Sequence, residues 1–158
     1  MKAVGSSAFG RAADLGPLFL RVGVGSVFAW HGWQKFDGGV SNFAGFLDSL
    51  GVPLPEVVAW LQVVAEGVGG LMLILGLFTR FVAVPLIAIS IGAIYLVKVN
   101  VGFIVPDAAG AELDVALLGG ELALLFLGPG RVSLDAMFGM ETSATHLDTG
   151  RRRPPVAA

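Results

Sequence analysis

The sequence predicts an all-α integral membrane protein: a bundle of four membrane-crossing helices, with a short interfacial helix between the first two. Apolar residues make up 55% of the 158 residues and charged residues only 14%, well below the roughly 25% of a soluble domain. Four apolar stretches approach the ~20 residues that a helix needs to cross a bilayer. Pairs of small residues four apart, typical of closely packed membrane helices, occur on every stretch.

The four apolar stretches cover 15–36, 57–78, 81–101 and 113–127. No small-residue cleavage site follows the first stretch, so we expect it to remain as a helix. The fourth is the shortest and crosses only if Asp114 lies at the outer interface. A soluble protein with buried helices is the alternative, but four such runs leave too few polar residues to cover its surface.

The connection between the first two stretches predicts a short helix of its own over 41–51. Four apolar side chains fall on one face of that helix, and Gly51 marks its end. They are Phe43, Phe46, Leu47 and Leu50. We expect this helix to lie in the membrane interface or to pack on the end of the bundle, and both can hold together.

Small residues four apart predict where the helices touch, because membrane helices approach most closely where side chains are small. One such pair occurs on each stretch. The pairs are Gly25 with Ala29, Ala65 with Gly69, Ala88 with Gly92, and Gly119 with Ala123.

Basic residues predict the orientation and the domain limits. Loops rich in Lys and Arg stay in the cytoplasm, and with four spans most of them fall on one side: Lys2, Arg11, Arg80, Arg131 and 151–153. We therefore expect a multi-pass protein with both termini in the cytoplasm. The expected limits are 1–14 for a cytoplasmic N-terminal segment, 15–139 for the membrane domain and 140–158 for a disordered polar tail.

The residue inventory excludes several kinds of chemistry. The absence of cysteine removes disulfides, iron–sulfur clusters and cysteine-ligated zinc, and a net charge of −2 argues against nucleic acid as a partner. His31 is the only histidine within a stretch, and His146 lies in the tail, so one chain cannot hold haem between two histidines. We expect no metal site. No self-sufficient catalytic motif occurs, which leaves enzymatic activity undecided.

Ionisable residues inside the stretches predict a buried polar cluster in the outer half of the bundle. Glu66 is the strongest case, because a charge near the bilayer centre costs at least ~2.5 kcal/mol unless it is compensated. His31 and Lys35 share one helical face, as do Gln62 and Glu66. Six residues form the expected cluster: His31, Lys35, Gln62, Glu66, Lys98 and Glu121.

This cluster allows two interpretations. Its members could pair only with one another and hold the helices in register. They could instead line a small cavity for a polar head group, a proton route or a redox ligand, the usual role of intramembrane ionisable residues. A second set, Arg21, Arg80, Arg131 and Asp135, marks the cytoplasmic helix ends, where Arg131 and Asp135 are spaced to form a local pair.

Short motifs in a fixed order resemble the DoxX family of small bacterial membrane proteins. Arg21 precedes FAWHGWQKF at 28–36, EGVGG at 66–70 leads to GLFTR at 76–80, and Glu121 precedes GPGRVSLD at 128–135. The resemblance covers residues 15–139. The positions carried over are Arg21, His31, Gly32, Lys35, Glu66, Gly70, Thr79, Arg80, Glu121, Gly130, Arg131 and Asp135.

The resemblance implies a four-span protein of the bacterial inner (plasma) membrane, related to subunits of thiosulfate:quinone oxidoreductases and of redox-stress assemblies. It implies no settled reaction. We therefore expect an accessory or quinone-facing subunit of a membrane oxidoreductase complex, with other membrane or peripheral redox subunits, or further copies of this chain, as partners. A quinone is the one cofactor the cluster suits. The alternatives are a small solute or proton transporter, which broken helices would favour, and a scaffold or assembly protein without a ligand.

Overall fold

A computed structural model of the chain describes residues 15–106 and 110–140. Its helices, in chain order, are α2 (Gly16–Asp37), α3 (Val40–Ser49), α4 (Pro55–Leu75), α5 (Thr79–Leu96), the 3₁₀ turn η1 (Lys98–Asn100), α6 (Ala111–Leu127) and α7 (Leu134–Met137). The N-terminal segment 1–14 and the tail from 141 onward, with their basic residues and His146, lie outside the described residues. The described part confirms the predicted helical bundle and the predicted short helix between the first two long ones.

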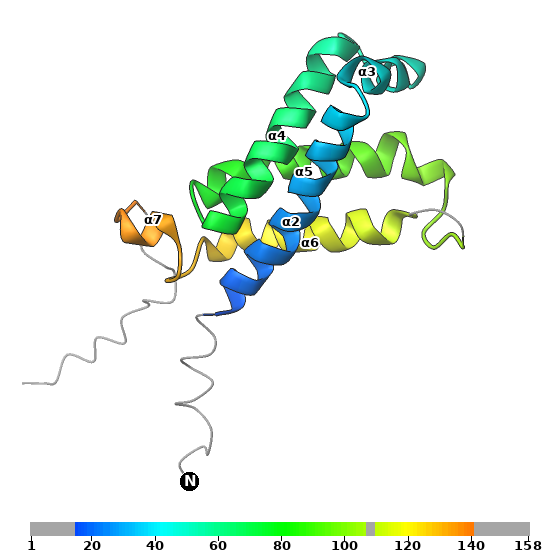
Figure 1. The fold of residues 1–158 in the computed structure, drawn as a ribbon. Helices are drawn as coiled ribbons and strands as arrows, with labels where there is room; N and C mark the ends of the chain where they lie inside the picture. Colours follow the sequence, from blue (N-terminus) through cyan, green and yellow to red (C-terminus); the bar gives the residue numbers. More distant parts are fainter. Residues whose placement is uncertain (1–14, 107–109, 141–158) are drawn as a thin grey trace, which may run out of the picture.

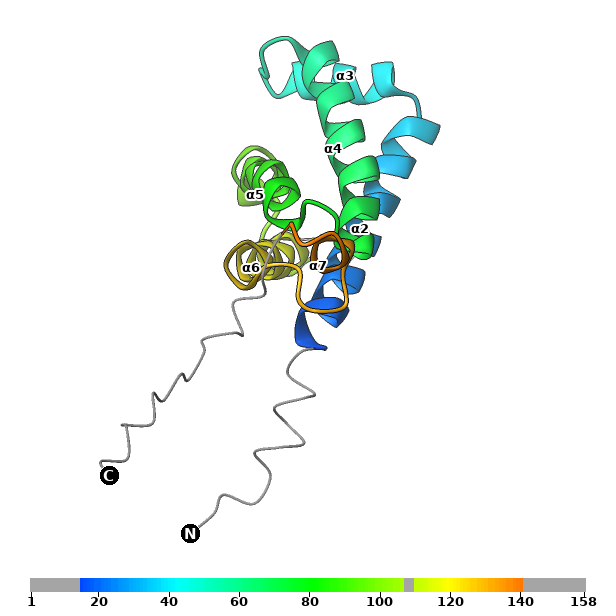
Figure 2. The same cartoon turned by 90° about the vertical axis from the view of Figure 1, so that its left-hand side faces the viewer.

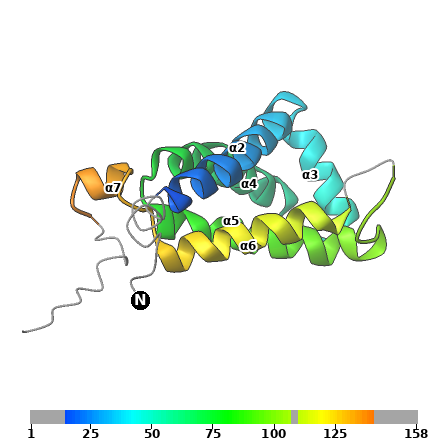
Figure 3. The ribbon, with the colours of Figure 1, turned by 90° about the horizontal axis from the view of Figure 1, so that it is seen from below.

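Two helix pairs build the bundle. α2 packs along α4, α5 packs along α6, and the two pairs cross at a steep angle (Figures 1 and 2). The pairs meet near α7 and diverge toward α3, which lies at the opposite end of the bundle (Figures 1 and 3). These two ends are called the α7 end and the α3 end below.

Local sequence explains where the long helices begin and end. Prolines stand in the first turn of α2 and α4, where no backbone N–H is needed. α4 ends at Leu75 because Gly76 takes a left-handed conformation (φ +69°), with Gly76 N donating to Leu73 O and Leu77 N to Met72 O. The prediction that this helix continues to Phe78 is therefore wrong by three residues.

Glycines let α2 and α4 touch backbone to backbone. A Cβ on Gly32 would meet the backbone of Gly67, and one on Gly70 would meet the backbone of Gly25 and Ala29. The predicted Gly25–Ala29 pair is thus at a helix contact, and its partner on α4 is Gly70, whereas Gly67 meets Gly32.

Two other predicted small pairs lie elsewhere. Gly92 on α5 and Gly119 on α6 have open space where a Cβ would stand, so neither marks a close approach of helices. On α6 the contacting glycine is Gly120, which packs against Val24. Small residues are abundant in this chain, and spacing alone does not tell which of them face a partner.

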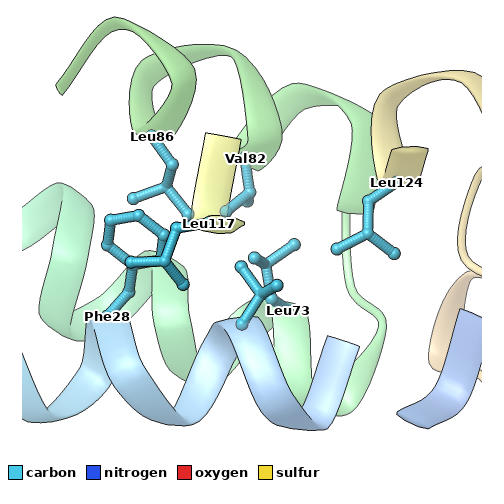
Figure 4. Packing of buried hydrophobic residues seen from close by; sticks show 7 residues of the cluster. Phe28, Leu73, Val82, Leu86, Leu117 and Leu124 are labelled. Atoms are coloured by element: carbon cyan, nitrogen blue, oxygen red, sulfur yellow. The ribbon is translucent and has the colours of Figure 1, made fainter. Parts of the chain in front are cut away.

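The apolar core joins the two pairs where they cross. Phe28 and Leu73 from α2 and α4 pack against four residues of α5 and α6, as Figure 4 shows: Val82, Leu86, Leu117 and Leu124. A second cluster fixes α3 on α4, with Val40, Ala44 and Leu47 against Ala59 and Val63. Leu47 is therefore buried in protein, as the interpretation of a helix packed on the bundle requires.

Among the described helices, α4 and the segment Thr79–Asn100 are long and apolar enough by themselves to cross a membrane. α2 carries Arg21, His31 and Lys35, and α6 spans only about 25 Å at a rise of 1.5 Å per residue. α4 continues unbroken through Gly67–Gly70 and α5 through Pro85. The broken helices that would favour a transporter are therefore not found in α4 or α5.

Candidate functional site

A cavity of about 640 Å³ lies between the two helix pairs toward the α3 end. Most of its wall is apolar, and α3 contributes Phe43, Phe46 and Leu47 to it. Leu61, Phe46 and Leu96 line it while being 64%, 44% and 40% exposed, so the cavity opens on the apolar outer surface of the bundle. We call it the central cavity. Its polar lining residues are His31, Lys35, Gln62, Glu66, Ser90, Lys98 and Asp114.

The structure brings five of the six predicted cluster residues to this one cavity. The sixth, Glu121, is buried on α6 and contacts the cavity wall through Ser90. The predicted facing pairs also hold, since His31 and Lys35 on α2 and Gln62 and Glu66 on α4 all line the cavity. Helical spacing was sufficient to find these residues, because each pair is one turn apart.

An ion pair between Lys35 and Glu66 joins α2 to α4 at the cavity wall. The lysine Nζ donates to Glu66 Oε2 and also lies 5.2 Å from the ring centre of Phe43. The side chain of Glu66 is 3% exposed and that of Lys35 22%. The lysine therefore folds back toward the carboxylate and compensates the charge that the sequence places inside the membrane.

A second carboxylate is held on the opposite helix pair. Ser90 Oγ on α5 donates to Glu121 Oε1 on α6 at 2.8 Å. The other oxygen, Glu121 Oε2, is buried and has no hydrogen-bond partner within the described residues. Ser90 and Asp114 line the cavity but are not among the six predicted cluster residues. A lone serine in an apolar stretch carries no spacing signal, and only the fold brings it to a carboxylate 31 positions away.

The second predicted set lies at the α7 end, where Arg21, Arg80 and Asp135 bind main-chain atoms and do not line the central cavity. Arg21 is fully buried and donates to the carbonyls of Leu73, Ile74 and Val132. It therefore closes the C-terminus of α4, whose last carbonyls have no partner within the helix.

Asp135 closes the start of α5 in the same way. Its carboxylate accepts from Phe78 N at 2.7 Å and Thr79 N at 3.0 Å. This is a capping interaction at a helix N-terminus, and it holds Phe78 in a left-handed conformation (φ 49°) that a non-glycine residue rarely adopts. The sequence analysis predicted a local pair of Asp135 with Arg131 and did not predict these main-chain contacts.

Arg80 lies in the first turn of α5, and Arg131 lies in the segment between α6 and α7. Arg80 Nη1 donates to Leu125 O at 2.8 Å, which joins α5 to the end of α6. Thr79 is buried. Within residues 15–106 and 110–140, no three His, Asp or Glu side chains are grouped as metal ligands would be.

These features define a class: a helical membrane protein whose two helix pairs enclose a cavity lined with ion-paired and hydrogen-bonded side chains. The family model DoxX matches residues 16–99, more than half of the chain. The chain belongs to the DoxX family, as the resemblance of its motifs indicated. The match contains α2 to α5, and therefore both partners of the Lys35–Glu66 pair.

Three curated proteins are similar over most of their length. The uncharacterised membrane protein Rv3486 of Mycobacterium tuberculosis is 37% identical over 79% of this chain and 82% of its own. CatD of Bacillus subtilis, named as a candidate oxidoreductase, is 34% identical over 79% of this chain and 88% of its own. The inner membrane protein YphA of Escherichia coli is 33% identical over 80% and 93%. No solved structure matches the chain closely enough for comparison.

Proposed function

We propose that this protein is a quinone-binding accessory subunit of a membrane oxidoreductase complex, with the quinone head group in the central cavity. The observation that carries the proposal is the composition of that cavity. Apolar walls that open on the outer surface of the bundle surround a few polar side chains contributed by both helix pairs. Small-molecule sites have this composition, and a volume of about 640 Å³ lies within their usual range.

The cavity suits the two parts of a quinone. Its exposed apolar rim, with Leu61 and Leu96, can hold an isoprenoid tail that continues into the lipid. Lys35 in the wall can donate hydrogen bonds to head-group oxygens, since its ammonium group has three donors and Glu66 takes one of them. The Lys35–Glu66 ion pair, two of the seven polar lining residues, can also exchange partners with a ligand.

The electrons must come from elsewhere, because the sequence contains no self-sufficient catalytic motif. A partner protein with a flavin or metal redox centre would reduce or oxidise the bound quinone, and this chain would position it. The name of CatD is consistent with such a complex. We place the α7 end in the cytoplasm of a bacterial plasma membrane, because Arg21, Arg80 and Arg131 lie there.

Filling the cavity tests this function with a matched control. Gly92 lines the central cavity and Gly119 faces outward on α6, and both have open space at the Cβ position. Gly92→Leu and Gly119→Leu therefore gain similar helix propensity, roughly 0.5–1 kcal/mol each, and only Gly92→Leu occupies ligand space.

The measurement is the binding of a short-chain ubiquinone, and separately of a short-chain menaquinone, to the purified full chain in lipid nanodiscs by equilibrium dialysis. We expect binding to the wild type and to Gly119→Leu, and loss of binding in Gly92→Leu. Equal binding by all three would show that the quinone dissolves in lipid only. No binding of either quinone would leave the scaffold role as the better interpretation.

A further inference from the structure

A second, smaller pocket of about 230 Å³ lies at the corner between α2 and α3. Three residues, His31, Lys35 and Phe43, line both this pocket and the central cavity. The wall between the two spaces is therefore made of side chains, and the Lys35–Glu66 ion pair is part of it. We call the smaller space the outer pocket.

The remaining lining of the outer pocket is polar and faces outward. Gln34 and Asn42 are exposed, and Asn42 Nδ2 donates to Gly38 O at 2.8 Å, which fixes the turn between the two helices. The pocket lies where α2 ends, at the level of the membrane interface. Exposed amides at that depth hold water, whereas the apolar rim of the central cavity faces lipid.

His31 therefore lies between a watery space and the proposed quinone site. Three charged groups act on its imidazole, namely Lys35 from α2 itself, Lys98 from η1 and Asp114 from α6, and Glu66 from α4 lines the same cavity. An imidazole has two nitrogens that can accept and release a proton on different sides of the ring. Among the described residues, no other imidazole lines both spaces.

We propose that the outer pocket is the proton port of the central cavity, with His31 as the proton carrier and the Lys35–Glu66 pair as the closed wall beside it. The inference rests on the proposed function, because the proton acceptor is an oxygen of the quinone reduced by the redox partner. One nitrogen of His31 takes a proton from water in the outer pocket, and the other releases one proton to that oxygen. That release restores the neutral imidazole in its other tautomer, and a ring flip returns the remaining proton to the side of the central cavity. Each passage therefore moves one proton and no electron.

Accessibility of single cysteines tests the port without any quinone, since the natural chain has no cysteine. Single-cysteine variants are treated with a positively charged, membrane-impermeant methanethiosulfonate in membrane vesicles, from the side at which Asn42→Cys reacts. We expect His31→Cys to react from that side. Ser90→Cys, in the cavity behind the wall, and Gly119→Cys, facing lipid, should react about tenfold more slowly or not at all, because only a hydrated thiolate reacts.

The decisive experiment removes Lys35, whose ion pair with Glu66 is part of the wall between the two spaces. Adding Lys35→Ala to Ser90→Cys should make position 90 react, whereas Lys35→Arg, which keeps the cation, should leave it protected. Each variant is first checked for wild-type elution in size-exclusion chromatography. An unreactive His31→Cys beside a reactive Asn42→Cys would overturn the port, as would a Ser90→Cys whose reactivity is the same with and without Lys35.

Proton transfer itself has a separate readout. The visible absorbance of a hydroxynaphthoquinone changes when its hydroxyl group ionises, so the bound probe reports proton arrival after a pH jump on the Asn42 side. His31→Phe should slow this change roughly tenfold or more, whereas His146→Phe, the change at the chain's other histidine, should not. An unchanged rate in His31→Phe would overturn the carrier role. Absence of probe binding would count against the quinone site, while cysteine accessibility would still decide the port.

Discussion

The α7 end and the α3 end of the bundle both contain buried charges, but they satisfy them differently. At the α7 end, Arg21 and Asp135 bind main-chain atoms at the end of α4 and the start of α5. At the α3 end, Lys35 binds Glu66, side chain to side chain, beside a cavity. Main-chain partners cannot be exchanged without unwinding a helix end, whereas side-chain partners can re-form around a ligand. We therefore expect the α7 end to maintain the fold, and we propose the α3 end as the binding end.

Arg21→Met should have the largest effect, because it deletes a fully buried cation and leaves the carbonyls of Ile74 and Val132 without their donor. Each buried acceptor left unsatisfied costs about 1–3 kcal/mol. The expected result is a low yield of folded protein and a strongly lowered melting temperature in detergent. Wild-type thermal stability in this variant would remove the distinction between the two ends.

Lys35→Met tests the other end, because it leaves the carboxylate of Glu66 buried without its cation. We expect a loss of about 2 kcal/mol, less than for Arg21 since Lys35 is partly exposed. Lys35→Met combined with Glu66→Leu should recover most of that stability, because an apolar pair can replace a buried ion pair. Quinone binding should stay lost in the double variant. Recovery of both properties would make the pair purely structural.

Gly70→Ala tests the helix crossing that joins the two ends. Its new methyl group would press on the backbone of Gly25 and Ala29, which cannot move aside as a side chain could. Overpacking of this kind costs about 1–3 kcal/mol. Gly119→Ala, where a Cβ meets open space, is the matched control and should be neutral or slightly stabilising. Thermal unfolding of both variants in one detergent measures the difference.

Ser133→Ala should have the smallest effect and sharpen the contrast within the α7 end. Ser133 Oγ caps α7 by accepting from Ala136 N at 3.1 Å, and such a cap contributes about 1 kcal/mol. Ser90→Ala, which removes the donor of Glu121, is the counterpart in the cavity wall. Both should lower the melting temperature modestly, but only Ser90→Ala should also weaken quinone binding. A binding change in Ser133→Ala would show that the two ends are coupled.

Much of the fold could be predicted because long apolar runs of about 20 residues identify membrane helices in a sequence. The described ends of α2 and α6 lie within two residues of the predicted ones, and the face of α3 that carries Leu47 was correctly expected to be apolar. The end of α4 was missed because the apolar run continues past Gly76, and hydropathy does not register a left-handed residue.

Some cavity residues could be predicted because they occur as pairs one helical turn apart, whereas Ser90 has no such partner on its own helix. His31 with Lys35, and Gln62 with Glu66, lie one turn apart, so their shared faces follow from helix geometry. The contacts of Asp135 with Phe78 and Thr79 join positions 57 and 56 residues apart, and no local pattern encodes them. The contact between α2 and α4 depends on which glycines meet, and spacing alone did not distinguish the candidate positions.

The glycine contacts between α2 and α4 have a mechanical consequence. Helices that touch main chain to main chain cannot slide past each other, so this pair moves as one rigid arm. Its link to α5 is the three-residue segment 76–78, clamped by Arg21 and Asp135. The two helix pairs are therefore fixed to each other by hydrogen bonds to main-chain atoms at the α7 end, which is the end away from the central cavity.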